Sequence, residues 1–115
     1  MKRNKYYNRK TNGYDSKKES KRAVELQTLE NNGYISHLEE QKKFELQPSF
    51  KILTSEPPIK EKTIRAITYF VDFYYYDNEK KRWVAEDVKG FKTDVYKIKS
   101  KIFQYTYRDI LFLET

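Results

Sequence analysis

The fold is decided by TIRAITYFVDFYYYDNEKKRWVAEDVK, the stretch of residues 63–89. Residues 63–76 are rich in β-branched and aromatic side chains, which favour a strand. Asp77 and Asn78 then favour a turn, and residues 82–89 favour a second strand. The stretch therefore predicts a β-hairpin at the centre of the fold.

The sequence after the hairpin predicts a helix and then a parallel strand. Gly90 ends the second strand, and Thr93 or Asp94 is suited to cap a helix. Residues 110–113 are a short apolar run typical of a buried strand, which the intervening helix allows to add in parallel. Apolar side chains at helical spacing predict the face of the helix that packs on the sheet, formed by Val95, Ile98, Ile102 and Tyr105.

The sequence before the hairpin predicts a helix that begins near Ser16. Ser16 and Glu19 form a capping-box pattern, in which a capping side chain is followed three residues later by an acidic one. The helix runs to about Asn31, and Gly33 is suited to end it.

Extended patterns predict the remaining strands. Residues 34–38 and 44–46 indicate two short strands or one interrupted strand. Residues 54–62 contain Pro57 and Pro58 and predict a surface loop, because proline cannot donate to a sheet ladder. The predicted order is α, β, β, β, α, β, an α/β fold with a mixed central sheet flanked by helices.

The composition indicates one small domain and excludes several chemistries. At 115 residues the chain is near the size of a single domain, and we expect residues 14–115 to form it after a flexible basic arm of residues 1–13. There is no cysteine, which excludes disulfides and thiolate metal sites. The single histidine, His37, and the lack of a glycine-flanked serine argue against acyl transfer. No apolar run approaches the ~18 residues that span a bilayer, so we expect a soluble protein with no membrane partner.

The net charge of +7 is concentrated at the N-terminus. Residues 1–22 contain nine Lys or Arg and two acidic residues, so the rest of the chain has fifteen of each sign and is neutral. Interleaved tyrosines add stacking surfaces, and this pattern favours a nucleic-acid partner over a merely solvated tail. The candidate contacts are Lys2, Arg3, Lys5, Arg9, Lys10, Lys17 and Lys18.

Two lysines of the predicted second helix are further candidates for nucleic-acid contact. Lys97 and Lys101 share a helix face at i,i+4 and are suited to follow a phosphate backbone. The simpler interpretation of either lysine alone is a solvated helix face.

Three residues of the hairpin are the candidate reactive groups. Strand alternation places Asp72 on a face with Phe70 and Tyr74, away from Val71 and Phe73. A lone carboxylate in so apolar a strand is costly to bury unless it binds a cation or a strong donor. In the second strand, Asp87 and Lys89 share a face. If the hairpin pairs Asp72 near Asp87, two carboxylates converge beside an ammonium group.

This arrangement suits a divalent cation with oxygen ligands, for which Mg²⁺ is the natural occupant. A cation there polarises a phosphodiester while Lys89 stabilises the added negative charge. The alternative is a structural Asp–Lys pair at the end of a sheet. Glu86 is a second choice for the metal ligand, because a β-bulge before it exchanges the two faces of the strand.

Glu19 has two interpretations as well. At the third position of a helix it needs no role beyond capping. It also lies on one helical stripe with Ala23 and Leu26, which places it in line with buried residues and able to point towards the metal.

The order of these residues resembles the PD-(D/E)XK nuclease superfamily. In that pattern a helix supplies a glutamate, as Glu19 does here, one strand an aspartate, and the next strand an acidic residue two before a lysine. Val71 stands where the superfamily has proline before its aspartate, Asp72. The sequence is also similar to a phage-encoded family catalogued as a domain of unknown function, through the segments SKKE, ELQP, RAITY and EDVKGFKT, residues 16–19, 45–48, 65–69 and 86–93.

The resemblance implies a restriction-endonuclease-like αβββαβ core and a Mg²⁺-dependent endonuclease, with Mn²⁺ as a substitute. The implied catalytic residues are Glu19, Asp72, Asp87 and Lys89, with the three carboxylates as metal ligands. Some compact members resolve Holliday junctions, so we expect branched DNA as the substrate and the host cytoplasm as the location. We also expect a homodimer, because one protomer has room for one site and cutting two opposed strands requires two.

Two alternatives remain open from the sequence. One is a nicking or restriction-like nuclease that acts on ordinary duplex DNA. The other is a non-catalytic DNA-binding protein that uses the basic arm alone.

Overall fold

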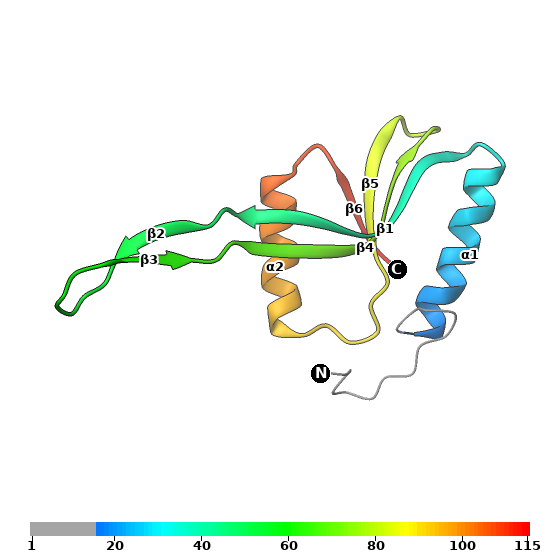
Figure 1. Ribbon diagram of the computed structural model, residues 1–115. Helices are drawn as coiled ribbons and strands as arrows, with labels where there is room; N and C mark the ends of the chain where they lie inside the picture. The colour runs from blue at the N-terminus through cyan, green and yellow to red at the C-terminus, as the bar shows by residue number, and fades with distance from the viewer. Residues whose placement is uncertain (1–15) are drawn as a thin grey trace.

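The computed structural model describes residues 16–115, which form an α/β fold with a mixed central sheet and two helices (Figure 1). The four strands of the sheet lie in the order β1-β4-β5-β6. Neighbours are antiparallel among β1 (Ile35–Gln47), β4 (Ile67–Asp77) and β5 (Arg82–Asp87). β6 (Leu111–Glu114) adds in parallel to β5. The predicted hairpin and the predicted parallel last strand are confirmed.

Both predicted helices are also confirmed, with their caps. In α1 (Lys17–Asn31), the Oγ of Ser16 accepts a hydrogen bond from the Glu19 backbone N–H at 3.0 Å. Gly33 follows α1 with a φ of 83°, a left-handed conformation that glycine adopts without steric cost. In α2 (Asp94–Thr106), Thr93 is the capping residue, and its side chain accepts from the Tyr96 N–H at 3.0 Å.

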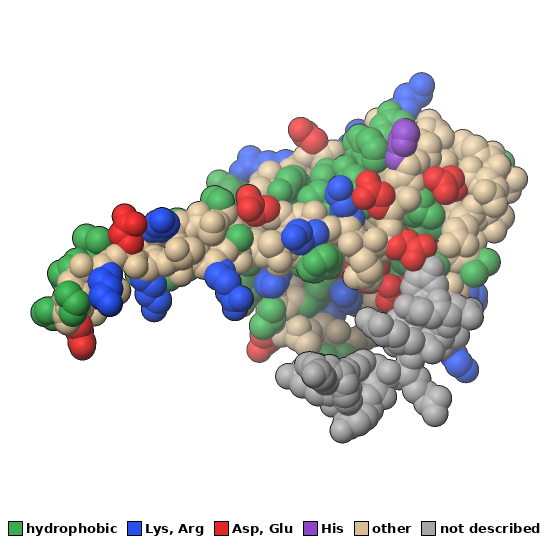
Figure 2. All heavy atoms as spheres, viewed as in Figure 1, with side chains coloured by type: hydrophobic (Ala, Val, Ile, Leu, Met, Phe, Trp, Pro, Cys, Tyr) green, Lys and Arg blue, Asp and Glu red, His purple; other side chains and the backbone are tan. Residues whose placement is uncertain are grey.

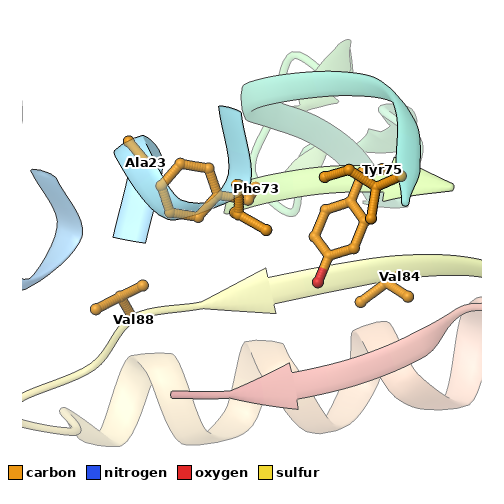
Figure 3. Packing of buried hydrophobic residues seen from close by; sticks show 7 residues of the cluster. Ala23, Phe73, Tyr75, Val84 and Val88 are labelled. Atoms are coloured by element: carbon orange, nitrogen blue, oxygen red, sulfur yellow. The ribbon is translucent and has the colours of Figure 1, made fainter. Parts of the chain in front are cut away.

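Each helix covers one face of the sheet and forms its own hydrophobic cluster. Ala23 and Leu26 of α1 pack with Phe73, Tyr75, Val84 and Val88, several of which Figure 3 shows. Phe103 and Tyr96 of α2 pack on the opposite face with Phe44, Tyr69, Val71 and Ala85. Val84 and Ala85 are successive residues of β5, so they point to opposite faces and enter different clusters.

β1 is a single strand with irregularities. It pairs with β4 along most of its length, with register shifts between Ser36 and Glu39 and again near Gln47. His37 and Gln41 have positive φ values of 57° and 55°. Of the two sequence-based alternatives, the structure therefore supports one interrupted strand.

A two-stranded ribbon projects from the central sheet and was not predicted. β2 (Phe50–Leu53) pairs with β3 (Glu61–Ile64), and Figure 1 shows the pair extending away from the body. The expectation of a loop over residues 54–62 is wrong for Glu61 and Lys62, and the expected strand over residues 63–76 is broken at residues 65–66. The prolines occupy the turn of the ribbon, where no ladder donor is required.

The face of α2 that packs on the sheet was predicted incorrectly. The buried residues of α2 are Tyr96, Ser100 and Phe103, and Tyr96 and Phe103 each follow directly after a residue of the expected stripe. Aromatic packing explains which face of α2 is buried. The ring of Phe103 contacts Phe44, Tyr69 and Phe112, and it fills more of the core than the neighbouring Ile102 would. The expected stripe is exposed instead: Val95 62%, Ile98 60%, Ile102 37% and Tyr105 70%.

Neither helix among residues 16–115 is both long and apolar enough to cross a membrane. The predicted division into a flexible arm of residues 1–13 and a domain of residues 14–115 stays a prediction, because residues 1–15 lie outside the described part of the chain.

Candidate functional site

The site lies where β4 separates from β5. The paired residues of β4 run from Phe73 to Asp77, so the ladder with β5 stops just before Asp72. On the other side of β4, the pairs that flank Asp72 leave Gln41 opposite it, at positive φ. Val71 and Phe73 enter different hydrophobic clusters. The alternation expected for β4, with Val71 and Phe73 on one face, therefore fails at Asp72, between the two cores.

Asp72 and Asp87 replace the missing ladder with reciprocal hydrogen bonds. The backbone N–H of Asp72 donates to Asp87 Oδ1 at 2.9 Å, and the N–H of Val88 donates to Asp72 Oδ2 at 2.8 Å. Each carboxylate thus satisfies a backbone donor of the opposite strand. Both are buried, with 8% of Asp72 and none of Asp87 exposed. The condition for a shared site, that the hairpin brings Asp72 near Asp87, is therefore met.

Asp87 is further enclosed on the α2 side. The hydroxyl of Tyr69 donates to its Oδ2, so both carboxylate oxygens of Asp87 have partners. Burial raises the pKa of Asp87, and the charge of Asp72 acts in the same direction, whereas the bonds from Tyr69 and Asp72 N–H and the charge of Lys89 lower it. Burial and the bond to Asp87 in turn raise the pKa of Tyr69, which keeps its proton.

Glu19 reaches the same point from α1. It is buried, and its Oε2 accepts a hydrogen bond at 3.2 Å from Nε2 of Gln41. The same Nε2 donates to Asp72 Oδ1 at 3.1 Å. One amide nitrogen therefore joins the carboxylates of Glu19 and Asp72. The Ser16 side chain caps the helix by accepting from the Glu19 backbone N–H, so capping and a role of the Glu19 carboxylate in the site are compatible.

Lys89 lies beside Asp87 on the α2 side of the sheet. Its Nζ is 4.8 Å from the centroid of the Tyr96 ring, and Tyr96 packs near Tyr69. Its backbone N–H donates to the carbonyl of Thr115, which continues the β5–β6 pairing. The prediction that Asp87 and Lys89 share a face is supported, because both contact the tyrosines on that side.

Glu86 points to the opposite face of β5. Its side chain is fully buried and forms an ion pair with Arg22 of α1. Tyr75 OH donates to its Oε1 at 2.8 Å, and Thr115 Oγ1 donates to its Oε2 at 3.0 Å. Donors from three parts of the chain thus surround Glu86. Of the two neighbouring acids, Asp87 is the one that contacts Asp72.

A pocket of about 340 Å³ borders the site on the α1 side, lined by Lys18, Lys21, Arg22, Glu25, Val88 and Thr115. Val88 connects the pocket to the carboxylates, because its N–H holds Asp72. Arg22 is paired with Glu86 and Glu25, whereas Lys18 and Lys21 are exposed lysines on successive positions of one helix face. The pocket therefore offers cationic groups next to the acidic ones.

The other candidate nucleic-acid contacts are exposed where the structure describes them. Lys17 and Lys18 lie in the first turn of α1, and Lys97 and Lys101 lie on α2. The remaining candidates lie outside the described residues: Lys2, Arg3, Lys5, Arg9 and Lys10.

Sequence reasoning did not find three residues that the structure adds to the site. Gln41 and Lys21 sit in charged segments with no distinguishing pattern. Tyr69 had a signal, because it ends the RAITY segment, whose resemblance had no physical role attached to it. Its role is to hold Asp87.

The carboxylate oxygens of the site match in part the ligands that a divalent cation requires. Mg²⁺ is commonly held by one or two carboxylates and completes its coordination with water and substrate phosphates. Glu19 and Asp72 supply two such carboxylates. The Gln41 amide nitrogen donates a hydrogen bond to both and lies where a cation shared by the two would lie. Within residues 16–115, no group of three or more His, Cys, Asp and Glu side chains is arranged to hold a metal ion. A site with two carboxylates is consistent with that.

No curated protein and no solved structure matches this sequence. Over residues 3–113 it matches the family described as "Protein of unknown function (DUF1064)", and the chain therefore belongs to that family.

Proposed function

We propose that the protein is a Mg²⁺-dependent DNA endonuclease of the PD-(D/E)XK type. The observation that carries the proposal is the cluster of buried carboxylates at the junction of β4 and β5. Asp72 and Asp87 are held by reciprocal hydrogen bonds to the backbone. The Gln41 amide connects the carboxylates of Glu19 and Asp72. Buried carboxylates are costly, and sites that collect them beside a lysine are commonly functional.

The topology supports the same proposal. With the ribbon of β2 and β3 set aside, the elements follow the order α1, β1, β4, β5, α2, β6, which is αβββαβ. The last strand is parallel to β5. This is the order expected for a restriction-endonuclease-like core.

The roles of the residues follow from their contacts. Glu19 and Asp72 would hold Mg²⁺, or Mn²⁺ in its place. Asp87 acts as a positioning residue in the observed geometry, because it is fully buried and holds the backbone N–H of Asp72, whereas Asp72 shares the Gln41 amide with Glu19. When bound, the cation supplies Lewis-acid polarisation of the phosphodiester.

Lys89 supplies positive charge on the other side of Asp87. Its ammonium group stabilises negative charge that develops on the attacked phosphate, and the Tyr96 ring limits where that ammonium can lie. Lys18 and Lys21 at the bordering pocket would bind a neighbouring phosphate of the same strand.

A homodimer fits this function, and α2 offers a surface for it. The exposed residues Val95, Ile98, Ile102 and Tyr105 are spaced three, four and three residues apart, which is the spacing of a helix–helix seam. Packing α2 of one protomer on α2 of a second around a twofold axis buries this stripe and supplies two sites, as cleavage of branched DNA at two strands requires.

The test is a cleavage assay on a labelled four-way junction and on a linear duplex of matched sequence, with EDTA, Mg²⁺ or Mn²⁺. We expect metal-dependent cleavage that is faster on the junction. Cleavage of the duplex alone would support a nicking or restriction-like enzyme. Binding without cleavage of either DNA in any metal would refute the nuclease and leave a DNA-binding protein.

A matched pair of variants ties any cleavage to this site. Asp72→Asn removes the charge that both Gln41 and the metal would use, and we expect it to abolish cleavage. Asp109→Asn changes an exposed aspartate after α2 and serves as the control. Calorimetric titration with Mn²⁺ alone should show weaker binding for Asp72→Asn than for Asp109→Asn. Equal binding would remove Asp72 from the metal site.

A further inference from the structure

We propose that the ribbon of β2 and β3 is a DNA-binding element that contacts a duplex about one helical turn from the carboxylates. The proposal rests on the DNA substrate of the proposed function and adds a contact surface to it. The two strands of the ribbon continue β1 and β4, the strands that contribute Gln41 and Asp72 to the site. The ribbon therefore extends in a fixed direction from any duplex bound at the site.

The two faces of the ribbon differ in charge. The register pairs Phe50 with Ile64 and Ile52 with Lys62, and the hydrogen bond from Thr54 N–H to Lys60 O at 2.8 Å extends it by one pair. Paired residues of an antiparallel ladder share a face. One side, which we call the lysine face, consists of Phe50, Ile52, Thr54, Lys60, Lys62 and Ile64.

The lysine face contains two ammonium groups and no carboxylate. The opposite face carries Lys51, Leu53, Glu61 and Thr63, and there the lysine is neutralised by an exposed ion pair with Glu61 at 3.7 Å. Lys60 and Lys62 are both exposed. Figure 2 shows Lys and Arg side chains spaced along the ribbon, with Asp or Glu side chains and hydrophobic side chains towards its end. The cationic groups of the lysine face are thus available to a polyanion.

The shape of the ribbon suits a DNA groove. Two strands lie about 4.8 Å apart, and a two-stranded ribbon is narrow enough for the major groove, which is about 12 Å wide. In that position, Lys60 and Lys62 reach phosphates, and the half-exposed Phe50 and Ile52 contact sugars and base edges.

The reach along the chain matches the repeat of DNA. Lys62 and Lys60 are ten and twelve residues before Asp72, separations that span at most about 33 and 40 Å at ~3.3 Å per residue. One turn of B-form DNA is about 34–36 Å. A duplex that presents a phosphate to the carboxylates therefore has the next turn of its groove within reach of the ribbon.

A second copy of the chain is a poorer occupant of the lysine face. A twofold contact of this face with itself brings four ammonium groups together, and the face has no carboxylate to neutralise them. Lysine is also depleted in protein interfaces. The seam on α2, by contrast, is apolar along its length, so the two surfaces suit different partners.

The experiment measures binding of a 30-bp duplex by fluorescence anisotropy in EDTA over a series of KCl concentrations. The test variant is Lys60→Gln with Lys62→Gln. The control is Lys80→Gln with Lys81→Gln, which removes the same charge from exposed lysines of the β4–β5 turn. Each phosphate contact contributes about 0.9 to the slope of log K against log salt, so the test variant should have a slope shallower by about 1.8. The control should keep the wild-type slope.

The outcomes separate this proposal from the nuclease proposal. A wild-type slope in the test variant, or the same loss in both variants, would overturn the ribbon as a DNA contact. A change of mass in sedimentation with no change in slope would overturn it in favour of a protein–protein contact. A reduced slope in a protein that cleaves no DNA would support the ribbon and refute the nuclease. A wild-type protein that binds no DNA would refute both.

Discussion

Glu86 and Asp87 are neighbouring buried acids on opposite faces of β5, and exchanging each for its amide should affect different properties. We expect Glu86→Gln to lower stability and leave cleavage nearly unchanged. We expect Asp87→Asn to lower cleavage and leave stability nearly unchanged. The two substitutions are matched in shape and in charge removed, so each is the control for the other.

The loss expected for Glu86→Gln comes from its four donors. Arg22 Nη2 and Tyr75 OH donate to one carboxylate oxygen, and Arg22 Nε and Thr115 Oγ1 donate to the other. An amide nitrogen in place of either oxygen turns an acceptor of two bonds into a donor. Hydrogen bonds to charged groups contribute about 1.5–3 kcal/mol each, and the partly exposed Arg22 recovers some of this by turning to water.

We therefore expect the free energy of unfolding of Glu86→Gln to fall by about 3 kcal/mol. At about 4 °C per kcal/mol for a domain of this size, the melting temperature should fall by about 12 °C. Asp87→Asn keeps an acceptor for the Asp72 N–H and can donate to the Tyr69 oxygen, while it removes a buried charge. Its stability should change by less than about 1 kcal/mol.

Urea unfolding tests the expected changes in stability, and initial cleavage rates measured on the same preparations test the expected changes in activity. Loss of the charge at Asp87 should slow cleavage about 10²–10³-fold, a range typical of removing one electrostatic element of a site. The reasoning is refuted if Glu86→Gln slows cleavage that much while stability is kept, because Glu86 would then be the reactive acid and Asp87 the structural one.

Three further predictions concern the ammonium group, the helix seam and pH. Lys89→Ala should slow cleavage about 10²–10³-fold yet bind DNA normally in EDTA, and a parallel loss of binding would contradict a role in the reaction. Ile98→Glu should halve the mass measured by sedimentation, whereas Val24→Glu on the exposed face of α1 should not; an unchanged mass would exclude the α2 seam. Because the folded pKa of Asp87 is raised, its stabilising contribution is present below the pKa of an unfolded aspartate and lost as pH rises through the folded value. The stability of Asp87→Asn relative to wild type should therefore be greater at about pH 7 than at about pH 4, and an equal difference at both would contradict the buried charge.

Sequence patterns predicted the elements whose signals are local. The Ser16 and Thr93 caps were identified because a capping side chain bonds within its own turn. The meeting of Asp72 with Asp87 was also predictable, because the short turn at Asp77 fixes the register of the hairpin.

Features that depend on distant partners were not predictable in the same way. On α2, the apolar stripe through Ile102 and the aromatic one through Phe103 are one residue apart, and only the shape of the facing sheet selects the second. Gln41 gains its role from two residues that are distant in sequence, Glu19 and Asp72. The ribbon was missed because the strands on either side of its turn are only four residues long and expose most of their side chains, so burial leaves little mark on their sequence.

The reciprocal bonds between β4 and β5 have a consequence for how such a chain changes over generations. Asp72 and Asp87 each receive a buried backbone N–H, and losing either leaves that donor unpaired at a cost of about 1–3 kcal/mol. A descendant under no pressure to react with any substrate would still be selected to keep an acceptor oxygen, from aspartate or asparagine, at both positions, so that it folds. The persistence of acceptor side chains at these two positions in a related sequence is therefore weak support for activity. Glu19 and Lys89, whose side chains accept no backbone N–H of the β4–β5 junction, are better residues by which to recognise a descendant that has lost activity.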